Sequence, residues 1–170
     1  MEREILISPE DIRKRVKDLA AKISSDYGGK EPILVGILNG VVFFFSDLVR
    51  ELTIPVKIDF IRAASYGSQM TSSGTVKISK DVEISVQGKP VLLIEDIVDT
   101  GSTLAHIIDN IRNKGADSVK VCAFIDKTER RTKAVPIHYR GFEIEEGFLV
   151  GYGLDYNEQY RDLPGIYVLK

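Results

Sequence analysis

Several classes of protein are excluded by what this chain lacks. Its 170 residues include a single cysteine, Cys122, so no disulfide can form within the chain. No apolar stretch approaches the ~18 residues that a membrane-spanning helix needs. Residues 1–10 lack the long apolar segment of a secretion signal. We therefore expect a cytoplasmic protein that does not associate with membranes.

The chain also lacks an excess of positive charge. It carries 23 lysines and arginines against 25 aspartates and glutamates, a formal net charge of −2, so a nucleic acid is not the expected partner. No cluster of histidine and cysteine predicts a zinc site, and we expect His106 and His138 to be structural or surface residues. The phosphate-binding patterns G-x-x-x-x-G-K-S/T and G-x-G-x-x-G are absent, so any phosphate site must have another design.

The remaining composition is that of an ordinary globular protein, with 44% hydrophobic and 28% charged residues. We find no internal repeat, no low-complexity segment and no linker. Residues 1–170 are therefore expected to form a single domain.

Apolar runs of strand length alternate with helical patterns along the chain. The expected helices lie from Ser8 to Gly28, at 41–49 and at 103–114. The expected strands lie at 32–38, 55–64, 90–94 and 118–125, with a further strand or two within 76–86 and short strands after 134. This order predicts an α/β fold with a doubly wound, mainly parallel sheet and a small cap formed by the chain ends.

Short segments that contain polar residues follow four of these expected strands. They are Leu38-Asn39-Gly40, Ser65-Tyr66, Asp99 to Thr103, and Asp126-Lys127. In open α/β sheets, ligands bind beyond the carboxyl ends of the strands. We therefore expect these four loops to converge on one crevice.

The most informative segment is Val91–Leu104, in which an apolar run leads to Glu95 and Asp96 and then to Asp99-Thr-Gly-Ser-Thr. Carboxylates at the end of a buried strand can accept hydrogen bonds from sugar hydroxyls. A turn with free N–H groups and hydroxyls at a helix N-terminus suits a phosphate. One segment could thus bind both a ribose and its 5-phosphate.

This segment closely resembles the phosphoribosyl pyrophosphate (PRPP) signature of type I phosphoribosyltransferases, and all thirteen positions from Val91 to Thr103 fit. A second segment, residues 147–163, resembles the C-terminal signature of the hypoxanthine-guanine phosphoribosyltransferases. The resemblance implies an enzyme that joins a 6-oxopurine to PRPP, releasing pyrophosphate and giving IMP, with GMP as a further product. It also implies Mg²⁺ as cofactor and a homodimer or homotetramer.

The resemblance assigns roles residue by residue. Asp99 corresponds to the general base, and Lys127 to the residue that reads the purine 6-oxo group. Binding of PRPP and its phosphate is implied for Glu95, Asp96, Asp99, Thr100, Gly101, Ser102 and Thr103. Pyrophosphate contacts are implied for Leu38, Asn39, Gly40, Ser65, Tyr66 and Arg161. Purine contacts are implied for Lys127, Phe148, Leu149 and Asp155, and metal contacts for Asp155, Glu95 and Asp96.

Two further expectations come from the family. Its pyrophosphate loop often contains a non-proline cis peptide, which we expect at Leu38–Asn39. Many relatives carry Lys or Arg where this chain has Asn39, so the strength of pyrophosphate binding is open. The polar segment 65–75 is expected to be a lid that closes over the reacting centre, because only Tyr66 and Met70 could anchor it.

Alternative interpretations remain at this stage. Asp99 could be a helix cap, Lys127 a solvated surface charge and Phe148 a core residue. The whole chain could be a sister enzyme that prefers xanthine, or a PRPP-binding regulator that controls RNA or DNA. The slightly acidic charge and the presence of Asp99 argue against the regulator.

Overall fold

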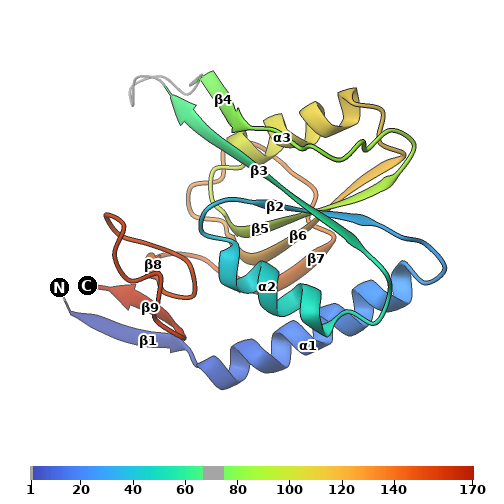
Figure 1. Ribbon diagram of the computed structural model, residues 1–170. Helices are drawn as coiled ribbons and strands as arrows, with labels where there is room; N and C mark the ends of the chain where they lie inside the picture. Colours follow the sequence, from blue (N-terminus) through green and yellow to red (C-terminus); the bar gives the residue numbers. More distant parts are fainter. Residues whose placement is uncertain (1, 67–74) are drawn as a thin grey trace.

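A six-stranded sheet forms the centre of the computed structural model, which describes residues 2–66 and 75–170 (Figure 1). The strand order is β4-β3-β2-β5-β6-β7. The strands are β2 (Ile33–Ile37), β3 (Lys57–Tyr66), β4 (Thr75–Lys80), β5 (Pro90–Val98), β6 (Ser118–Lys127) and β7 (Tyr139–Ile144). All neighbours are parallel except β3 and β4, which pair antiparallel at one edge.

Helices cover both faces of this sheet, as the alternating pattern predicted (Figure 1). The helices α1 (Pro9–Asp26) and α2 (Val42–Glu51) lie on one face, and α3 (Ser102–Asn113) lies on the other. Alternate residues of β5 point to opposite faces, so Leu92 packs in the α1–α2 core and Leu93 in the α3 core. The doubly wound α/β prediction is confirmed. No helix in residues 2–66 or 75–170 is long and apolar enough to cross a membrane.

The start of α1 follows directly from its sequence. The hydroxyl of Ser8 accepts a hydrogen bond from the Asp11 N–H at 3.1 Å, and Pro9 occupies the first helical turn. This side-chain cap satisfies one of the N–H groups that a helix leaves unpaired at its beginning.

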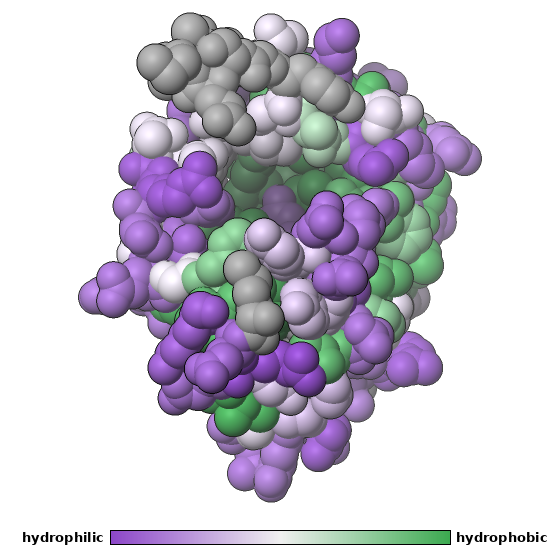
Figure 2. All heavy atoms as spheres, turned by 90° about the vertical axis from the view of Figure 1, so that its left-hand side faces the viewer, coloured by the Kyte–Doolittle hydropathy of each residue, from purple (hydrophilic) through white to green (hydrophobic). Residues whose placement is uncertain are grey.

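The two chain ends meet in a second, three-stranded antiparallel sheet, which we call the cap sheet. Its order is β1-β9-β8, with β1 (Arg3–Ile7), β8 (Phe148–Val150) and β9 (Ile166–Leu169). It stands beside the carboxyl ends of β2 and β5 (Figure 1). The face that carries the chain ends is hollowed between the cap sheet and the larger sheet, with both apolar and hydrophilic groups at the floor (Figure 2).

The structure differs from the sequence prediction in several strands. The strands expected at 55–64 and 118–125 end at Tyr66 and Lys127, so Ser65-Tyr66 and Asp126-Lys127 are the last residues of β3 and β6 and do not follow them. The strand expected at 90–94 continues to Val98, so Glu95 and Asp96 lie within β5 and not after it. Within 76–86 only residues up to Lys80 form a strand. The first strand, β1, was not expected, since its residues show no alternating pattern. It forms through its antiparallel pairing with β9.

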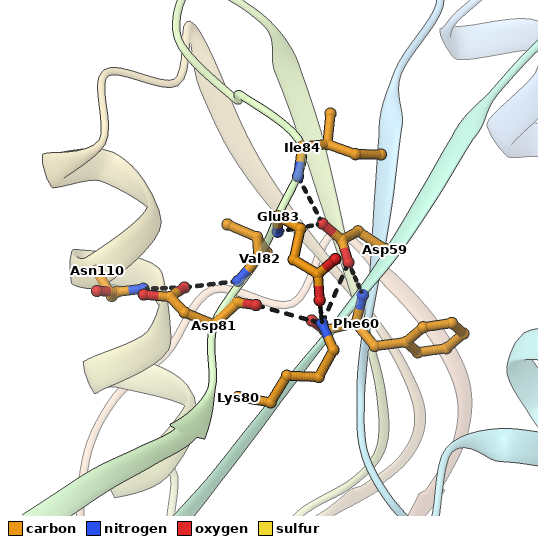
Figure 3. A network of polar contacts seen from close by, with 8 residues as sticks. All are labelled: Asp59, Phe60, Lys80, Asp81, Val82, Glu83, Ile84 and Asn110. Atoms are coloured by element: carbon orange, nitrogen blue, oxygen red, sulfur yellow. Dashed lines mark hydrogen bonds and ion pairs between the residues drawn. The ribbon is translucent and has the colours of Figure 1, made fainter.

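A buried carboxylate fastens the base of the β3–β4 hairpin (Figure 3). Asp59 accepts hydrogen bonds from the backbone N–H groups of Phe60, Glu83 and Ile84 at 2.7, 2.6 and 2.9 Å. The Lys80 ammonium adds an ion pair at 3.4 Å. Burial by itself would raise the pKa of Asp59, but these N–H groups and Lys80 hold it below its ordinary value.

A neighbouring aspartate connects the same segment to α3. Asp81 accepts hydrogen bonds from the Val82 N–H at 2.8 Å and the Asn110 amide at 3.2 Å. Lys114, just after α3, forms an ion pair with it at 3.1 Å. Residues 81–84 are therefore held on both sides although they form no strand.

We predict that Asp59→Asn lowers the free energy of unfolding at pH 7 by about 1–3 kcal/mol, because the amide nitrogen cannot accept the backbone N–H groups. A depressed pKa contributes stability above the ordinary aspartate pKa, and this contribution is lost as the pH falls. The difference between variant and wild type should therefore shrink below about pH 4. Urea denaturation at several pH values measures it, with exposed Asp18→Asn as the control. A constant difference down to pH 2–3 would contradict the prediction.

Candidate functional site

Four loops meet at the carboxyl ends of the parallel strands. The hydroxyls of Ser65, on β3, and Thr103, on α3, lie 3.1 Å apart. Arg130, which follows β6, forms an ion pair with Asp99, which follows β5. A Cβ placed on Gly40, after β2, would lie 1.9 Å from an Asp96 oxygen. The predicted convergence of these loops is therefore confirmed.

Glu95 and Asp96 form an adjacent pair of carboxylic acids beside the crevice. Burial, and then the neighbouring Asp96 charge, raise the pKa of Glu95 well above its ordinary value. Burial also raises the pKa of Asp96. Glu95 is buried and Asp96 is partly buried, so the ionised form of both side chains is unfavourable until cations or hydroxyl donors face them.

The turn after β5 is built to present backbone groups. Gly101 has φ +90°, a left-handed conformation that favours glycine, and α3 begins at the next residue. Gly101 has no side chain with which to cap the helix, although the Thr100 hydroxyl accepts the Ser102 N–H at 3.3 Å. A hollow of about 120 Å³ lies against this turn, lined by Glu95, Ile97, Val98, Asp99, Thr100, Gly101, Thr103 and Leu104. The arrangement suits an anion at a helix N-terminus.

Asp99 presents one engaged and one unengaged carboxylate oxygen. Its Oδ2 lies 3.3 Å from the exposed Arg130 guanidinium. Its Oδ1 is buried and has no hydrogen-bond partner among the described residues. A buried acceptor without a donor is costly, so this oxygen is available to a donor from a ligand.

Lys127 ends β6 and is only 7% exposed. Its ammonium forms an ion pair with Glu129 at 3.3 Å. The interpretation of Lys127 as a solvated surface charge is therefore wrong. Val98 pairs with Asp126 in the parallel register of β5 and β6, which brings the following residues, Asp99 and Lys127, to the same edge of the sheet.

The loop after β2 contacts the segment that follows the cap sheet strand β8. The Leu38–Asn39 peptide is cis, as the family resemblance implied. A Cβ on Gly153 would lie 2.0 Å from the Gly40 carbonyl oxygen, so the two backbones touch. Only glycines allow this approach, which sets the distance between the loop at 38–40 and the turn at 151–155.

Arg161 anchors the far side of that turn. Its guanidinium donates to the Gly153 carbonyl at 2.7 Å and to Glu158 at 3.2 Å, and it lies 3.6 Å from Asp155. Asp155 in turn accepts the Glu158 N–H at 2.9 Å. The two residues expected at pyrophosphate and metal thus already form one polar group.

Phe148 and Leu149, expected near the purine, differ in burial. Phe148 is 52% exposed and packs edge to face against Tyr156, with ring centroids 5.5 Å apart, whereas Leu149 is buried. The interpretation of Phe148 as a core residue is therefore wrong. Its ring is free to pack against a flat ligand.

Some expectations fall outside this geometry. The lid at 65–75 lies largely outside the described residues, as does the Tyr66 side chain. His106 is exposed on α3, and the His138 ring accepts the Val121 N–H at 3.0 Å; neither residue lines the hollow beside Asp99. Sequence reasoning missed the contacts of Arg130 and Arg131, which no spacing pattern distinguishes from surface charge.

We predict that Glu95→Gln stabilises the fold at pH 8. A carboxyl group with a raised pKa costs stability increasingly as the pH rises above its ordinary value, whereas glutamine keeps the shape without ionising. Thermal unfolding between pH 5 and 9 should show a rise in midpoint of about 2–4 °C for each kcal/mol gained. The exposed Glu146→Gln serves as the control. A variant less stable than wild type at pH 8 would be incompatible with the raised pKa.

Comparison with known proteins agrees with this geometry. The family model described as "Phosphoribosyl transferase domain" matches residues 4–157. The hypoxanthine-guanine phosphoribosyltransferase of Bacillus subtilis (strain 168) is 42% identical over 98% of this chain and 93% of its own length. The enzyme of that name from Aquifex aeolicus (strain VF5) is 45% identical, over 98% of this chain and 94% of its own.

Solved structures give the same result in three dimensions. A hypoxanthine-guanine phosphoribosyltransferase from Bacillus anthracis, with HEPES in the active site, has a TM-score of 0.94 and 40% identity, covering 98% of both chains. A hypoxanthine phosphoribosyltransferase from Staphylococcus aureus also has a TM-score of 0.94, with 41% identity, covering 98% of this chain and 91% of that one. This chain belongs to the phosphoribosyltransferase family, and within it to the hypoxanthine-guanine phosphoribosyltransferases.

Proposed function

We propose that this protein performs purine salvage by transferring the phosphoribosyl group of PRPP to hypoxanthine, and also to guanine, with release of pyrophosphate. The observation that carries the proposal is the position of Asp99 and Lys127. The two residues lie side by side at the paired ends of β5 and β6, and a hollow that could hold a phosphate lies against Asp99. Base recognition and phosphate binding would thus occur within one crevice. Residues 1–170 would act as a single domain.

The base would be recognised by complementary hydrogen bonds. Asp99 Oδ1, buried and unpartnered, would accept the proton that the purine sheds at N7 as it attacks the ribose. The Lys127 ammonium has three donors and no acceptor, so it favours a carbonyl at C6 over the amino group of adenine. Phe148 would stack on the ring, and the backbones of Leu149 and Asp155 would border its edge.

The remaining residues would bind PRPP. Glu95 and Asp96 would accept hydrogen bonds from the ribose 2- and 3-hydroxyls, and the turn from Thr100 to Thr103, which we call the phosphate turn, would hold the 5-phosphate. Leu38, Asn39, Gly40, Ser65, Tyr66 and Arg161 would contact pyrophosphate. The reaction would be dissociative with an oxocarbenium-like ribose, so the protein mainly positions reactants and stabilises charge.

The residues present fit Mg²⁺ as cofactor. Among the described residues, no three acidic, histidine or cysteine side chains form a ready metal cage. Mg²⁺ is usually held by one or two carboxylates together with substrate phosphates and water, which suits Asp155 on one side and Glu95 with Asp96 on the other. When bound, the ion would neutralise charge on the pyrophosphate group.

We also propose a homo-oligomer, a dimer or a tetramer, in the cytoplasm. Val42 and Phe43 on α2 are 41% and 42% exposed. Phe43 lines a hollow of about 500 Å³, around which Arg13 and Lys17 of α1 and Asp47 and Glu51 of α2 carry charges of opposite sign. Exposed apolar groups among charges of both signs suit a second copy of the same surface.

The alternative functions have less support. A regulator of RNA or DNA is not favoured, because relatives that match nearly the whole chain are named as transferases. A preference for xanthine would depend on backbone groups near Leu149 and Asp155, and a comparison of turnover rates tests it.

The decisive experiment compares turnover of hypoxanthine, guanine, xanthine and adenine at saturating PRPP, with Mg²⁺ and with excess chelator. We expect turnover of hypoxanthine and guanine, little with adenine, and none once the divalent cation is removed. Fastest turnover of xanthine would identify the sister enzyme. Tight PRPP binding without turnover of any base would support the regulator.

Asp99→Asn should lower kcat by about 10²-fold or more, the usual contribution of a positioned acid or base. The PRPP dissociation constant should change little because the phosphate turn keeps its backbone. Steady-state kinetics and calorimetric PRPP titration measure the two quantities, with exposed Asp18→Asn as the control. A kcat within threefold of the wild-type value would show that Asp99 is not the general base.

Lys127→Ala should raise KM for hypoxanthine and guanine and weaken discrimination against adenine. The ammonium is the group that donates to O6, and losing a charged hydrogen bond of this kind costs about 1.5–3 kcal/mol. Competition between hypoxanthine and adenine measures the selectivity, and the exposed Lys30→Ala provides a matched loss of charge. Unchanged selectivity would show that Lys127 does not read the base.

A further inference from the structure

The guanidinium of Arg131 lies between the ends of the two strands that carry Asp99 and Lys127. Its Nε donates to the Asp99 carbonyl at 2.8 Å, and its Nη2 donates to the carbonyls of Val98 at 3.0 Å and Lys127 at 3.2 Å. The side chain is only 20% exposed. One charged group therefore holds the main chain on both sides of the base-recognition edge.

Arg131 lies in the segment 128–133, which we call the strap. The strap donates hydrogen bonds to successive backbone carbonyls at the start of the phosphate turn. The N–H groups of Thr132 and Lys133 both donate to the Thr100 carbonyl at 3.0 Å. The strap thus bonds the three successive carbonyls of residues 98–100. A Cβ on Gly101 would lie 2.5 Å from the Lys133 carbonyl oxygen, so strap and turn are in direct contact.

A buried ion pair fixes the orientation of the Arg131 guanidinium. Asp126 is 3% exposed, and its Oδ1 accepts from Arg131 Nη2 at 2.5 Å. Its Oδ2 accepts from Arg140 Nε at 2.8 Å. Arg140 and Arg131 therefore bond the same carboxylate, that of Asp126, but the hydrogen bond from Arg140 Nε does not involve the phosphate turn.

These bonds determine where the phosphate turn points its donors. A peptide unit is planar, and in the trans form its N–H points opposite to its C=O. Holding the carbonyls of residues 98–100 toward the strap therefore directs the N–H groups of residues 99–101 away from it. In the described part of the chain the N–H groups of Thr100 and Gly101 have no protein acceptor.

We propose that Arg131 is a positioning residue of the phosphoribosyl transfer reaction. Through the strap it fixes the backbone that carries Asp99 and the N–H groups of the phosphate turn, without itself touching a substrate. The proposal rests on the proposed function, because it assigns what the positioned groups do. A guanidinium is suited to this task, since its fork can bond several carbonyls in one plane while a lysine ammonium cannot keep that geometry.

The experiment compares Arg131→Gln with Arg140→Gln. Both variants remove one ion pair from Asp126, but only the first releases the carbonyls of residues 98, 99 and 127. We expect Arg131→Gln to lower kcat by about 10²-fold, as a small misplacement of catalytic groups can, and to raise KM for PRPP. Arg140→Gln should stay within threefold of wild type, with a similar fall in melting temperature. Arg131→Lys should remain impaired.

Chemical rescue separates positioning from simple loss of stability. Guanidinium ion at non-denaturing concentration should restore part of kcat to Arg131→Ala, whereas methylammonium should not, and neither should stimulate Arg140→Ala. Equal loss of kcat in both glutamine variants, or absence of rescue with loss proportional to the fall in melting temperature, would overturn the proposal.

Hydrogen exchange gives a readout that does not depend on turnover. The Thr132 and Lys133 amides should exchange faster in Arg131→Gln than in Arg140→Gln, and unchanged protection would reject the strap. Absence of turnover in the wild-type protein would reject the proposed function instead. The two failures are therefore distinguishable.

Discussion

The parallel pairing of β5 with β6 is the interaction on which the rest of the structure depends. Its register runs from Pro90 opposite Ser118 to Val98 opposite Asp126. Both strands are buried on both faces, and a shift of one residue would turn every apolar side chain to the opposite face. The core therefore holds the register, and the register places Asp99 beside Lys127.

The site next depends on how closely backbones can approach. Gly40 and Gly153 touch where the loop after β2 meets the turn after β8, and Gly40 also lies against Asp96. A side chain at either position would push the cap sheet away from the acidic pair. The cap sheet, which joins the two chain ends, is thereby brought beside the crevice together with Phe148 and Asp155, the residues proposed to contact the purine.

The buried acidic residues of this molecule are of two kinds: those with partners that stabilise the fold, and those at the crevice that lack such partners. Asp59 and Asp126 are buried, but N–H groups or arginines satisfy them. Glu95 is buried with mainly another acid beside it, which raises its pKa. The Oδ1 of Asp99 is buried and has no donor among the described residues. Both features cost stability, so their occurrence at the crevice is typical of groups that serve binding rather than folding.

The sequence by itself determined the alternation of strands and helices, the start of α1 at Ser8 and the chemical character of the segment from Val91 to Thr103. These features are local, because periodicity, capping and turn residues act within a few positions of the chain. The family signatures added the cis peptide at Leu38–Asn39. Only the tertiary structure decided that β1 pairs with β9, that Lys127 is buried, and that Arg131 bonds the phosphate turn. Each of these depends on residues far apart in the chain meeting at a fixed distance, which no pattern of neighbouring residues specifies.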